Sequence, residues 1–367
     1  MAIPYLVVVP LVLRLHVGLA LQVPRAGAIT PERHDSLWTV RASRTNAALR
    51  GLTVAAGGVV WASGQRGTYL RSADGGATWI TDSVPGAAAF DFRGVAAVDA
   101  LTALLTVAAQ DTALIYRTTD GGRTWAVVYH DRHHGAFLDA IALWDRTRAI
   151  ALGDPMDGAF VVLLTEDGGA HWTRAPTTVQ PPALPGEGAF AASNSCLITG
   201  PGGIAWFATG GGAVARVFRT TDFGRSWTVA DTPIPAGNAA SGIFSLAFRD
   251  SVHGIAVGGD YEAPDSVRPN VALTSDGGRH WALADPARAT KFLSGVTYTG
   301  SLPDAPVVGV GTRGTWLSLD GGLTWLRIGA SPYNAVVATG GKAVAVGPHG
   351  TVALGLLEVS PAREARK

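Results

Sequence analysis

The side chains in this sequence that are best suited to binding a charged partner are arginines and carboxylates spread along the whole chain. A guanidinium group presents paired N–H donors that match a carboxylate, and a carboxylate accepts hydrogen bonds from cationic groups. The nine residues of interest stand at comparable points of a repeating pattern: Arg50, Arg66, Arg93, Arg313, Asp139, Asp154, Glu187, Asp260 and His349. Because they are far apart in the chain, only the fold can bring them together.

Two short stretches hold several side chains that could ligate a metal ion or transfer protons. The stretch 153–158 contains Asp154 and Asp157, which could bind Ca²⁺ or act as an acid/base pair. Its Asp-Pro and Asp-Gly pairs are also ordinary turn sequences, and we favour the turn. The stretch 130–134 contains three histidines and Asp131, but the spacing matches no standard metal site, which favours an exposed polar loop. We therefore expect no metal site and no cofactor.

A motif of the form Ser/Thr-x-Asp-x-Gly-x-(Thr/Ser/His)-Trp occurs six times and organises the rest of the chain. Its members are Asp74, Asp120, Asp167, Asp222, Asp276 and Asp320, with Trp79, Trp125, Trp172, Trp227, Trp281 and Trp325. Each copy lies between two β-rich runs, so it predicts the turn of a β-hairpin. The Asp can accept hydrogen bonds from the turn, the Gly supplies a positive φ, and the Trp suits the seam between neighbouring hairpins. We expect all of these roles to be structural.

This motif resembles the Asp-box repeat, the repeat of bacterial neuraminidase (BNR) type found in β-propellers, over about residues 36–358. The Gly-Gly-x-Thr-Trp form and the overall layout are similar to those of photosystem II stability/assembly factor-type propellers and their uncharacterised bacterial relatives. The resemblance implies a non-enzymatic propeller that binds a protein. The implied partner is a membrane-embedded complex, with a photosynthetic reaction centre as one possibility, and the implied role is assembly or stability.

The spacing of the motif predicts an all-β fold with seven four-stranded blades over residues 36–358. The six aspartates recur every 44 to 55 residues, which is the length of one propeller blade. We expect the later blades to open at Phe92, Phe137, Glu187, Ser241 and Phe292. A seventh repeat supplies three strands after residue 332, and its missing outer strand is available at residues 36–42. Pairing of that strand with 351–357 would close the ring and remove both free edges.

In such a ring, the segments leading into the first strands and the turns between second and third strands surround one mouth of a central channel. The basic residues at these points come mostly from blades one, two and six, and the acidic ones from blades three, four and five. We therefore expect a mouth that is positive on one side and negative on the other, and that docks a polar partner. The alternative is that these charges only pair with each other across the channel. Insertions at 177–184, 232–240 and 261–269 elaborate one side of the ring.

The composition adds limits on partners and on location. The chain of 367 residues has a net charge of +1, which does not suggest nucleic-acid binding. Its single cysteine, Cys196, is expected to be buried. Residues 3–23 are apolar and precede a small-residue cleavage site, so 1–28 is predicted to be an export signal, with an uncleaved membrane anchor as the alternative. Either would place the propeller in the periplasm or otherwise outside the cytoplasm, with a charged tail at 359–367.

Glycoside hydrolysis must be weighed because sialidases are also Asp-box propellers. The sialidase group carries a Phe/Tyr-Arg-Ile-Pro motif before its first box, and the nearest stretch here is 91–94, after the first box. No Tyr-Glu pair at matching blade positions is evident. We expect no catalytic residues; the alternatives are a sialidase-like glycoside hydrolase, a carbohydrate-binding propeller, or a propeller that binds a small ligand or a metal.

Overall fold

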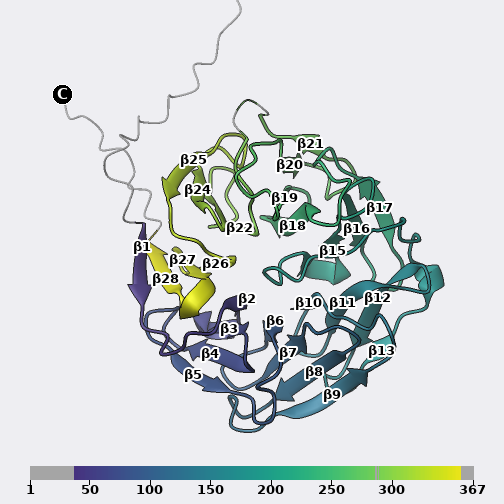
Figure 1. Ribbon diagram of the computed structural model, residues 1–367, viewed down its shortest axis with the longest axis vertical. Helices are drawn as coiled ribbons and strands as arrows, with labels where there is room; N and C mark the ends of the chain where they lie inside the picture. The colour runs from purple at the N-terminus through teal and green to yellow at the C-terminus, as the bar shows by residue number, and fades with distance from the viewer. Residues whose placement is uncertain (1–36, 286, 288, 357–367) are drawn as a thin grey trace, which may run out of the picture. The chain divides into compact units, whose positions relative to one another are not determined.

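The computed structural model describes residues 37–285, 287 and 289–356, and these residues form seven four-stranded antiparallel sheets. The sheets are blades arranged around a central channel, with the first strand of each blade nearest the centre (Figure 1). The predicted all-β, seven-bladed propeller is confirmed. The expectations for residues 1–28 and 359–367 lie outside the described residues.

The first three blades follow the predicted order of strands. Blade one consists of β2 (Leu49–Val54), β3 (Val60–Gly64), β4 (Thr68–Ser72) and β5 (Ile80–Ser83). Blade two consists of β6 (Phe92–Ala97), β7 (Ala103–Val107), β8 (Ala113–Thr118) and β9 (Ala126–Asp131). Blade three consists of β10 (Ala140–Leu143), β11 (Ala149–Met156), β12 (Ala159–Thr165) and β13 (Thr173–Arg174).

The other four blades repeat this order. Blade four consists of β14 (Leu197–Thr199), β15 (Ala205–Ala208), β16 (Arg216–Thr220) and β17 (Thr228–Asp231). Blade five consists of β18 (Ser241–Phe248), β19 (Gly254–Asp260), β20 (Val271–Thr274) and β21 (Ala282–Leu283). Blade six consists of β22 (Gly295–Tyr298), β23 (Val307–Gly311), β24 (Gly314–Ser318) and β25 (Leu326–Gly329). Blade seven consists of β26 (Ala335–Thr339), β27 (Lys342–Val346), β28 (Val352–Leu356) and β1 (Trp38–Arg41).

Blade seven closes the ring with strands from both ends of the described chain. β1 pairs with β28 in antiparallel register, with Trp38 opposite Gly355 and Arg41 opposite Val352. The Trp38 indole Nε1 donates to Thr315 Oγ1 of blade six over 2.9 Å. The predicted closure is therefore confirmed: β1 supplies the outer strand that completes blade seven.

The core lies between the blades rather than in one central mass. Each of the seven buried clusters combines apolar residues of two neighbouring blades. In the seam between blades seven and one, for example, Trp79 packs in one cluster with Val344 and Leu354. The outer strands are more exposed, as in β5, where Ile80 is 61% exposed. This packing fixes the first strands as a rigid frame around the channel.

The six repeat turns share one set of hydrogen bonds. In blade one, Ser72 Oγ donates to Asp74 Oδ1 and accepts from Gly76 N, both over 2.7 Å. Asp74 accepts from the backbone N and the hydroxyl of Thr78 over 2.9 and 2.6 Å. The set recurs around Asp120, Asp167, Asp222, Asp276 and Asp320, with a His ring in place of the hydroxyl in blades three and five.

These bonds account for the residue types of the motif. The hydroxyl and backbone hydrogen bonds from Thr78 lower the pKa of Asp74 to about 2, and those from Thr124 do the same for Asp120. The indole Nε1 donates to the carbonyl of the motif Gly, two residues after the Asp, in four turns, at Trp79, Trp172, Trp227 and Trp325. The carboxylates are thus engaged within their own turns.

The prediction for the start of blade four is wrong. The first strand was expected near Glu187, but β14 begins at Leu197. Gly188 still forms a bridge with Gly210 of blade four, but the residues after it bond to other blades: Ala189 N donates to Asp154, and the Asn194 amide donates to Val95 O and Ile141 O. The first strands of blades three and six also begin a few residues later than predicted, at Ala140 and Gly295.

Short 3₁₀ segments connect some strands: η2 (Ala56–Gly58), η3 (Thr177–Val179), η4 (Pro201–Gly203) and η6 (Pro348–Gly350). Within the described ranges, none of the helices has the length and apolar character needed to cross a membrane.

Candidate functional site

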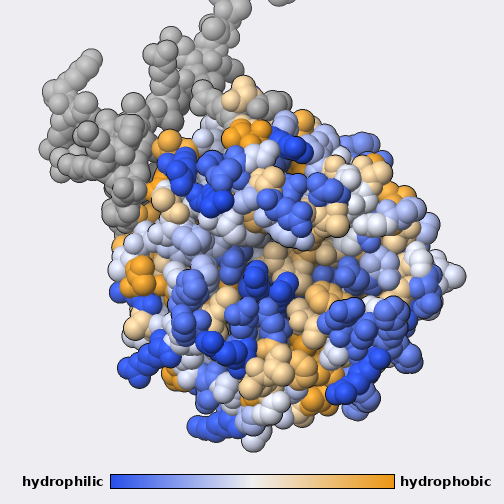
Figure 2. Space-filling view, in the orientation of Figure 1, coloured by the Kyte–Doolittle hydropathy of each residue, from blue (hydrophilic) through white to orange (hydrophobic). Residues whose placement is uncertain are grey.

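The central channel contains two cavities, one at each end of the first strands. The mouth cavity, of about 660 Å³, is lined by residues at the starts of these strands, such as Arg50 and Arg93. The far cavity, of about 630 Å³, is lined by residues at their ends, such as Thr53 and Thr339. On the face of the ring that Figure 2 shows, strongly hydrophilic residues lie beside apolar ones around the centre.

The turns between second and third strands lie on the same face as the mouth cavity. Backbone hydrogen bonds join them to the segments leading into first strands, from Gln65 N to Ala48 O over 3.0 Å and from Gly350 N to Ala47 O over 2.8 Å. This arrangement is the one that the order of strands predicts.

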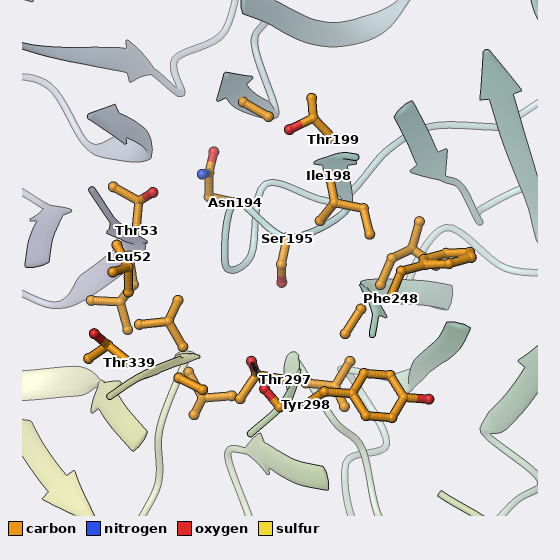
Figure 3. Close-up of a pocket in the computed structure, with 18 of the residues that line it drawn as sticks. Leu52, Thr53, Asn194, Ser195, Ile198, Thr199, Phe248, Thr297, Tyr298 and Thr339 are labelled. Atoms are coloured by element: carbon orange, nitrogen blue, oxygen red, sulfur yellow. Dashed lines mark hydrogen bonds between the residues drawn. The ribbon is translucent and has the colours of Figure 1, made fainter. Parts of the chain in front are cut away.

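Residues 188–195, here called the crossing segment, lie between the two cavities. Gly188–Ala192 line the mouth cavity, whereas Asn194 and Ser195 line the far cavity. Figure 3 shows Asn194 and Ser195 among the first strands of the surrounding blades. The crossing segment therefore separates the two ends of the channel.

Hydrogen bonds hold the crossing segment to three other blades. The Asn194 amide accepts from Ile141 N over 2.9 Å, and it donates to Ile141 O over 3.1 Å and to Val95 O over 2.9 Å. The Ser195 hydroxyl lies 2.6 Å from that of Ser245 in blade five. Asn194 has a φ of 67°, a left-handed conformation that Asn adopts more readily than most residues.

The arginine side of the mouth cavity consists of Arg50 and Arg93, which share Asp91 as a neighbour. Arg93 Nε donates to Asp91 Oδ2 over 3.0 Å, and Arg50 Nε lies 3.9 Å from the same oxygen. Burial lowers the pKa of Arg50, and the neighbouring Arg93 lowers it further, while Asp91 opposes both effects. One carboxylate shared by two guanidinium groups leaves formal positive charge on this side of the cavity.

The carboxyl side consists of Asp139 and Asp154 of blade three. Asp139 is only 1% exposed, and within the described part of the chain neither of its carboxyl oxygens has a hydrogen-bond partner. Burial raises the pKa of Asp139 well above its usual range, the nearby Asp154 raises it further, and Arg93 opposes the shift. Burial also raises the pKa of Asp154, although Ala189 N donates to its Oδ1 over 3.1 Å.

Aromatic rings form a third side of the mouth cavity. Phe190 of the crossing segment stacks on Phe244 of β18, with ring centroids 3.8 Å apart. Phe292 and Tyr261 meet the same Phe244 ring edge to face, at centroid distances of 4.8 and 6.1 Å. The mouth cavity thus combines guanidinium groups, carboxyl groups and an apolar aromatic surface.

Glu187 was predicted at the mouth, but it lies beneath it as part of the scaffold. It is 6% exposed and accepts from Arg216 Nε over 2.8 Å, from Thr209 Oγ1 over 2.6 Å and from Leu184 N over 2.8 Å. A second guanidinium nitrogen of Arg216 donates to its other oxygen. This paired, buried carboxylate holds the loop that leads into the crossing segment.

The remaining predicted residues lie on the mouth face but do not line the cavity. Arg66 and His349 are exposed at turns between second and third strands, with φ of 59° and 53°. Arg313 pairs with Asp265 over 2.7 Å. Asp260 accepts from the Asn238 amide over 3.0 Å. The structure therefore brings Arg50, Arg93, Asp139 and Asp154 together, and leaves the other five outside.

The two local stretches considered for metal binding form separate contacts. Asp154 faces the crossing segment, whereas Asp157 is exposed in the next turn and lies 3.4 Å from Arg174. His133 Nδ1 lies 2.6 Å from Asp131, and His134 Nδ1 lies 3.1 Å from Asp111. Among the residues that the structure describes, no three His, Cys, Asp or Glu side chains gather as a metal site would require. Cys196 is buried, as predicted.

The far cavity has a different lining. Figure 3 shows hydroxyl groups of Thr53, Ser195, Thr297 and Thr339 among aliphatic side chains around the channel. Arg249 also lines this cavity, but its Nη1 donates to Pro303 O over 2.8 Å.

Sequence reasoning missed two parts of the mouth cavity that left a signal. The first is Asp91, the hydrogen-bond partner of the predicted Arg93: it stands two residues before Arg93, a spacing at which side chains of an extended chain project to the same side. An aromatic residue stands at the start of five successive blades, namely Phe92, Phe137, Phe190, Phe244 and Phe292. Four of these rings line the mouth cavity, whereas Phe92 is fully buried in the core.

The fold and its channel define a seven-bladed β-propeller with a charged and aromatic mouth. No known protein family matches the sequence, and a search of curated proteins finds no match either. Several solved structures have a fold similar to that of this chain. A structure described as YCF48 bound to D1 peptide has a TM-score of 0.63 at 16% identity, covering 90% of this chain and 98% of that one.

Two further structures show how widely the fold is shared. YCF48 from Cyanidioschyzon merolae matches with a TM-score of 0.62 at 15% identity, covering 87% of this chain and 98% of that one. The GH74 xyloglucanase from Xanthomonas campestris matches with a TM-score of 0.60 at 15% identity; the match covers 89% of this chain but 54% of the enzyme. At these identities the comparisons establish the fold alone.

Proposed function

We propose that this protein is a non-enzymatic propeller that binds a protein partner at its mouth cavity. The observation that carries the proposal is the convergence of Arg50, Arg93, Asp139 and Asp154, from three different blades, on one cavity. A rigid ring with opposite charges and an aromatic surface at one opening is suited to holding a peptide segment, because it provides both orientation and apolar contact.

The more specific proposal is an accessory role in the assembly or stability of a membrane complex, with a photosynthetic reaction centre as the first candidate. It is supported by the likeness of the six turns to Asp-box repeats, to which we assign them, and by the fold of YCF48, which has been solved with a bound D1 peptide. We also propose that the propeller works outside the cytoplasm, because residues 3–23 form an apolar run before a small-residue site. N-terminal sequencing of the mature protein after cell fractionation tests this location.

The decisive experiment is affinity capture from native membranes solubilised in mild detergent. The double substitution Arg50→Glu with Arg93→Glu should abolish co-purification of the partner, and adding Arg66→Glu and Arg313→Glu should not restore it. The matched control is Arg123→Glu with Arg225→Glu, which makes the same charge change on repeat turns at the opposite face. Equal recovery with the mouth variant and the control would refute the mouth as the docking site.

Glycoside hydrolysis is the second candidate, because a GH74 xyloglucanase shares the fold and because two carboxyl groups lie in the mouth cavity. In that case Asp139 and Asp154 would be the acid and base. Incubation with xyloglucan and a panel of fluorogenic glycosides tests it. Turnover that is lost in Asp139→Asn would replace the binding proposal with an enzymatic one.

A further inference from the structure

The carboxyl side of the mouth cavity has properties that neither the arginine side nor the scaffold explains. Asp139 is 1% exposed and lines the cavity, yet within the described residues both of its oxygens lack a hydrogen-bond partner. A buried carboxyl group without donors is unfavourable, because desolvation is not compensated. The other acidic side chain that is buried among the described residues, Glu187, is satisfied by Arg216 and Thr209.

The arginines of the same cavity do not supply the missing donors. Arg93 donates from Nε to Asp91 over 3.0 Å and from Nη1 to Ala191 O over 3.3 Å. Arg50 faces the same Asp91. Arg93 therefore acts on Asp139 only through space, and the two sides of the cavity remain separate.

Aromatic and apolar surface adjoins the two carboxyl groups. The crossing segment contacts Asp154 through Ala189 N over 3.1 Å, and the next residue, Phe190, stacks on Phe244. Such a surface accommodates the aliphatic part of a long side chain, and an aromatic face attracts a cation. A side chain with an apolar stem and a cationic head satisfies both features.

We infer that the carboxyl side of the mouth cavity binds a lysine or arginine side chain of the partner, inserted toward Asp139 and Asp154 along Phe190 and Phe244. This inference rests on the proposed function, and it specifies the partner: a segment with a basic residue that enters the cavity and an acidic group that meets Arg50 and Arg93. The cationic head supplies the donors that Asp139 lacks.

The test uses the full ring and a library of N-acetylated, C-amidated dodecapeptides. The wild-type protein should enrich peptides that contain Lys or Arg. Replacing that residue with norleucine in the best peptide should weaken binding to the wild type by about tenfold or more, because a buried charge pair is lost. The double variant Asp139→Asn with Asp154→Asn should bind the best peptide and its norleucine form equally weakly. The double variant Arg50→Glu with Arg93→Glu should instead lose the preference for peptides that carry an acidic residue.

Two outcomes separate this inference from the proposed function. If peptides bind at the mouth without a basic residue, and norleucine replacement leaves affinity unchanged, the inference is overturned while protein binding stands. If the folded wild type enriches no peptide and captures no partner from membranes, both are overturned. The norleucine comparison uses the unaltered protein, so it decides even if the Asn variants fold poorly.

Discussion

The two ends of the channel are built on the same seven first strands and yet differ in chemistry. At the mouth, the strands begin with charged and aromatic residues, among them Arg50, Arg93 and Phe244. At the far end, the same strands finish mostly in threonines and aliphatic residues such as Thr53 and Thr339, and the lining there also includes Phe248, Tyr298 and Arg249 but no carboxylate. The crossing segment stands between them. The shared frame therefore does not distinguish the two ends of the channel; the residues at the ends of its strands do.

Aspartate serves two different purposes at the two faces of the ring. In the repeat turns at the far face, Asp74 is surrounded by donors, and its pKa is lowered to about 2. At the mouth, Asp139 is buried without donors, and its pKa is raised. Structural aspartates are satisfied within the fold, whereas the unsatisfied one lines the cavity proposed to bind a ligand.

The largest expected effect comes from reversing charge at one end only. Arg50→Glu with Arg93→Glu should weaken partner binding by about 100-fold, because the acidic group of the partner then meets carboxylates. Thr53→Glu with Thr339→Glu, which adds two carboxylates at the far end, should change affinity less than about twofold. Both are measured with the captured partner or the best peptide. Equal losses would show that the two ends act as one site.

The next largest effect is expected from Asn194, in the crossing segment that lies between the two ends of the channel. Asn194→Ala should lower the free energy of unfolding by about 2–3 kcal/mol, because Ile141 and Val95 lose buried hydrogen bonds. Asn194→Gly suits the positive φ but loses the same bonds, so a smaller loss for Gly than for Ala would show that backbone strain outweighs the extra entropy that Gly gives the unfolded chain. Urea unfolding provides the measurement. A loss below about 0.5 kcal/mol for Asn194→Ala would mean that the crossing segment is not a structural divider.

Much of the fold was predictable because local chemistry repeats. The turn around Asp74 needs the same residue types in six of the seven blades, so the motifs predicted the length of the repeat. The three further strands after residue 332 then predicted the seventh blade and its closure by Trp38. The start of blade four was predicted wrongly because the eight residues of the crossing segment carry no periodic pattern. The segment around Asn194 is held by side-chain bonds to other blades, which no local pattern encodes.

The site was predictable only in part for a related reason. Position in the repeat correctly assigned residues to one face, but it did not show which side chains reach the centre. Glu187 turned inward to Arg216, and Arg313 turned outward to Asp265. Asp265 belongs to the insertion at 261–269 and Arg216 to strand β16, and sequence spacing carries no information about either contact.

A smaller effect is expected on thermal stability when Asp139 at the mouth is replaced, and the change in the thermal midpoint should depend on pH. The pKa of Asp139 is raised in the folded state, so the folded protein holds its proton above the ordinary Asp pKa of about 4. The stability that depends on this proton is complete below that value and is lost as pH rises through the raised pKa. Asp139→Asn should therefore raise the thermal midpoint at pH 8 and leave it unchanged at pH 3.5. A variant that is less stable at pH 8 would show that the carboxylate is stabilised in the free protein.

The finest test compares aspartates at the two faces directly, by titrating ¹³C-labelled carboxyl groups with NMR. Asp74 and Asp120 should titrate near pH 2, because Thr78 and Thr124 donate to their ionised forms. Asp139 should titrate above the ordinary range, because burial without donors favours its neutral form. Addition of the best lysine-containing peptide should shift Asp139 downward and leave Asp74 unchanged, since only the mouth carboxyl gains a cationic donor. If Asp139 already titrates at or below pH 4 without peptide, the free cavity satisfies this carboxyl by itself, and the reason for expecting a basic residue there disappears.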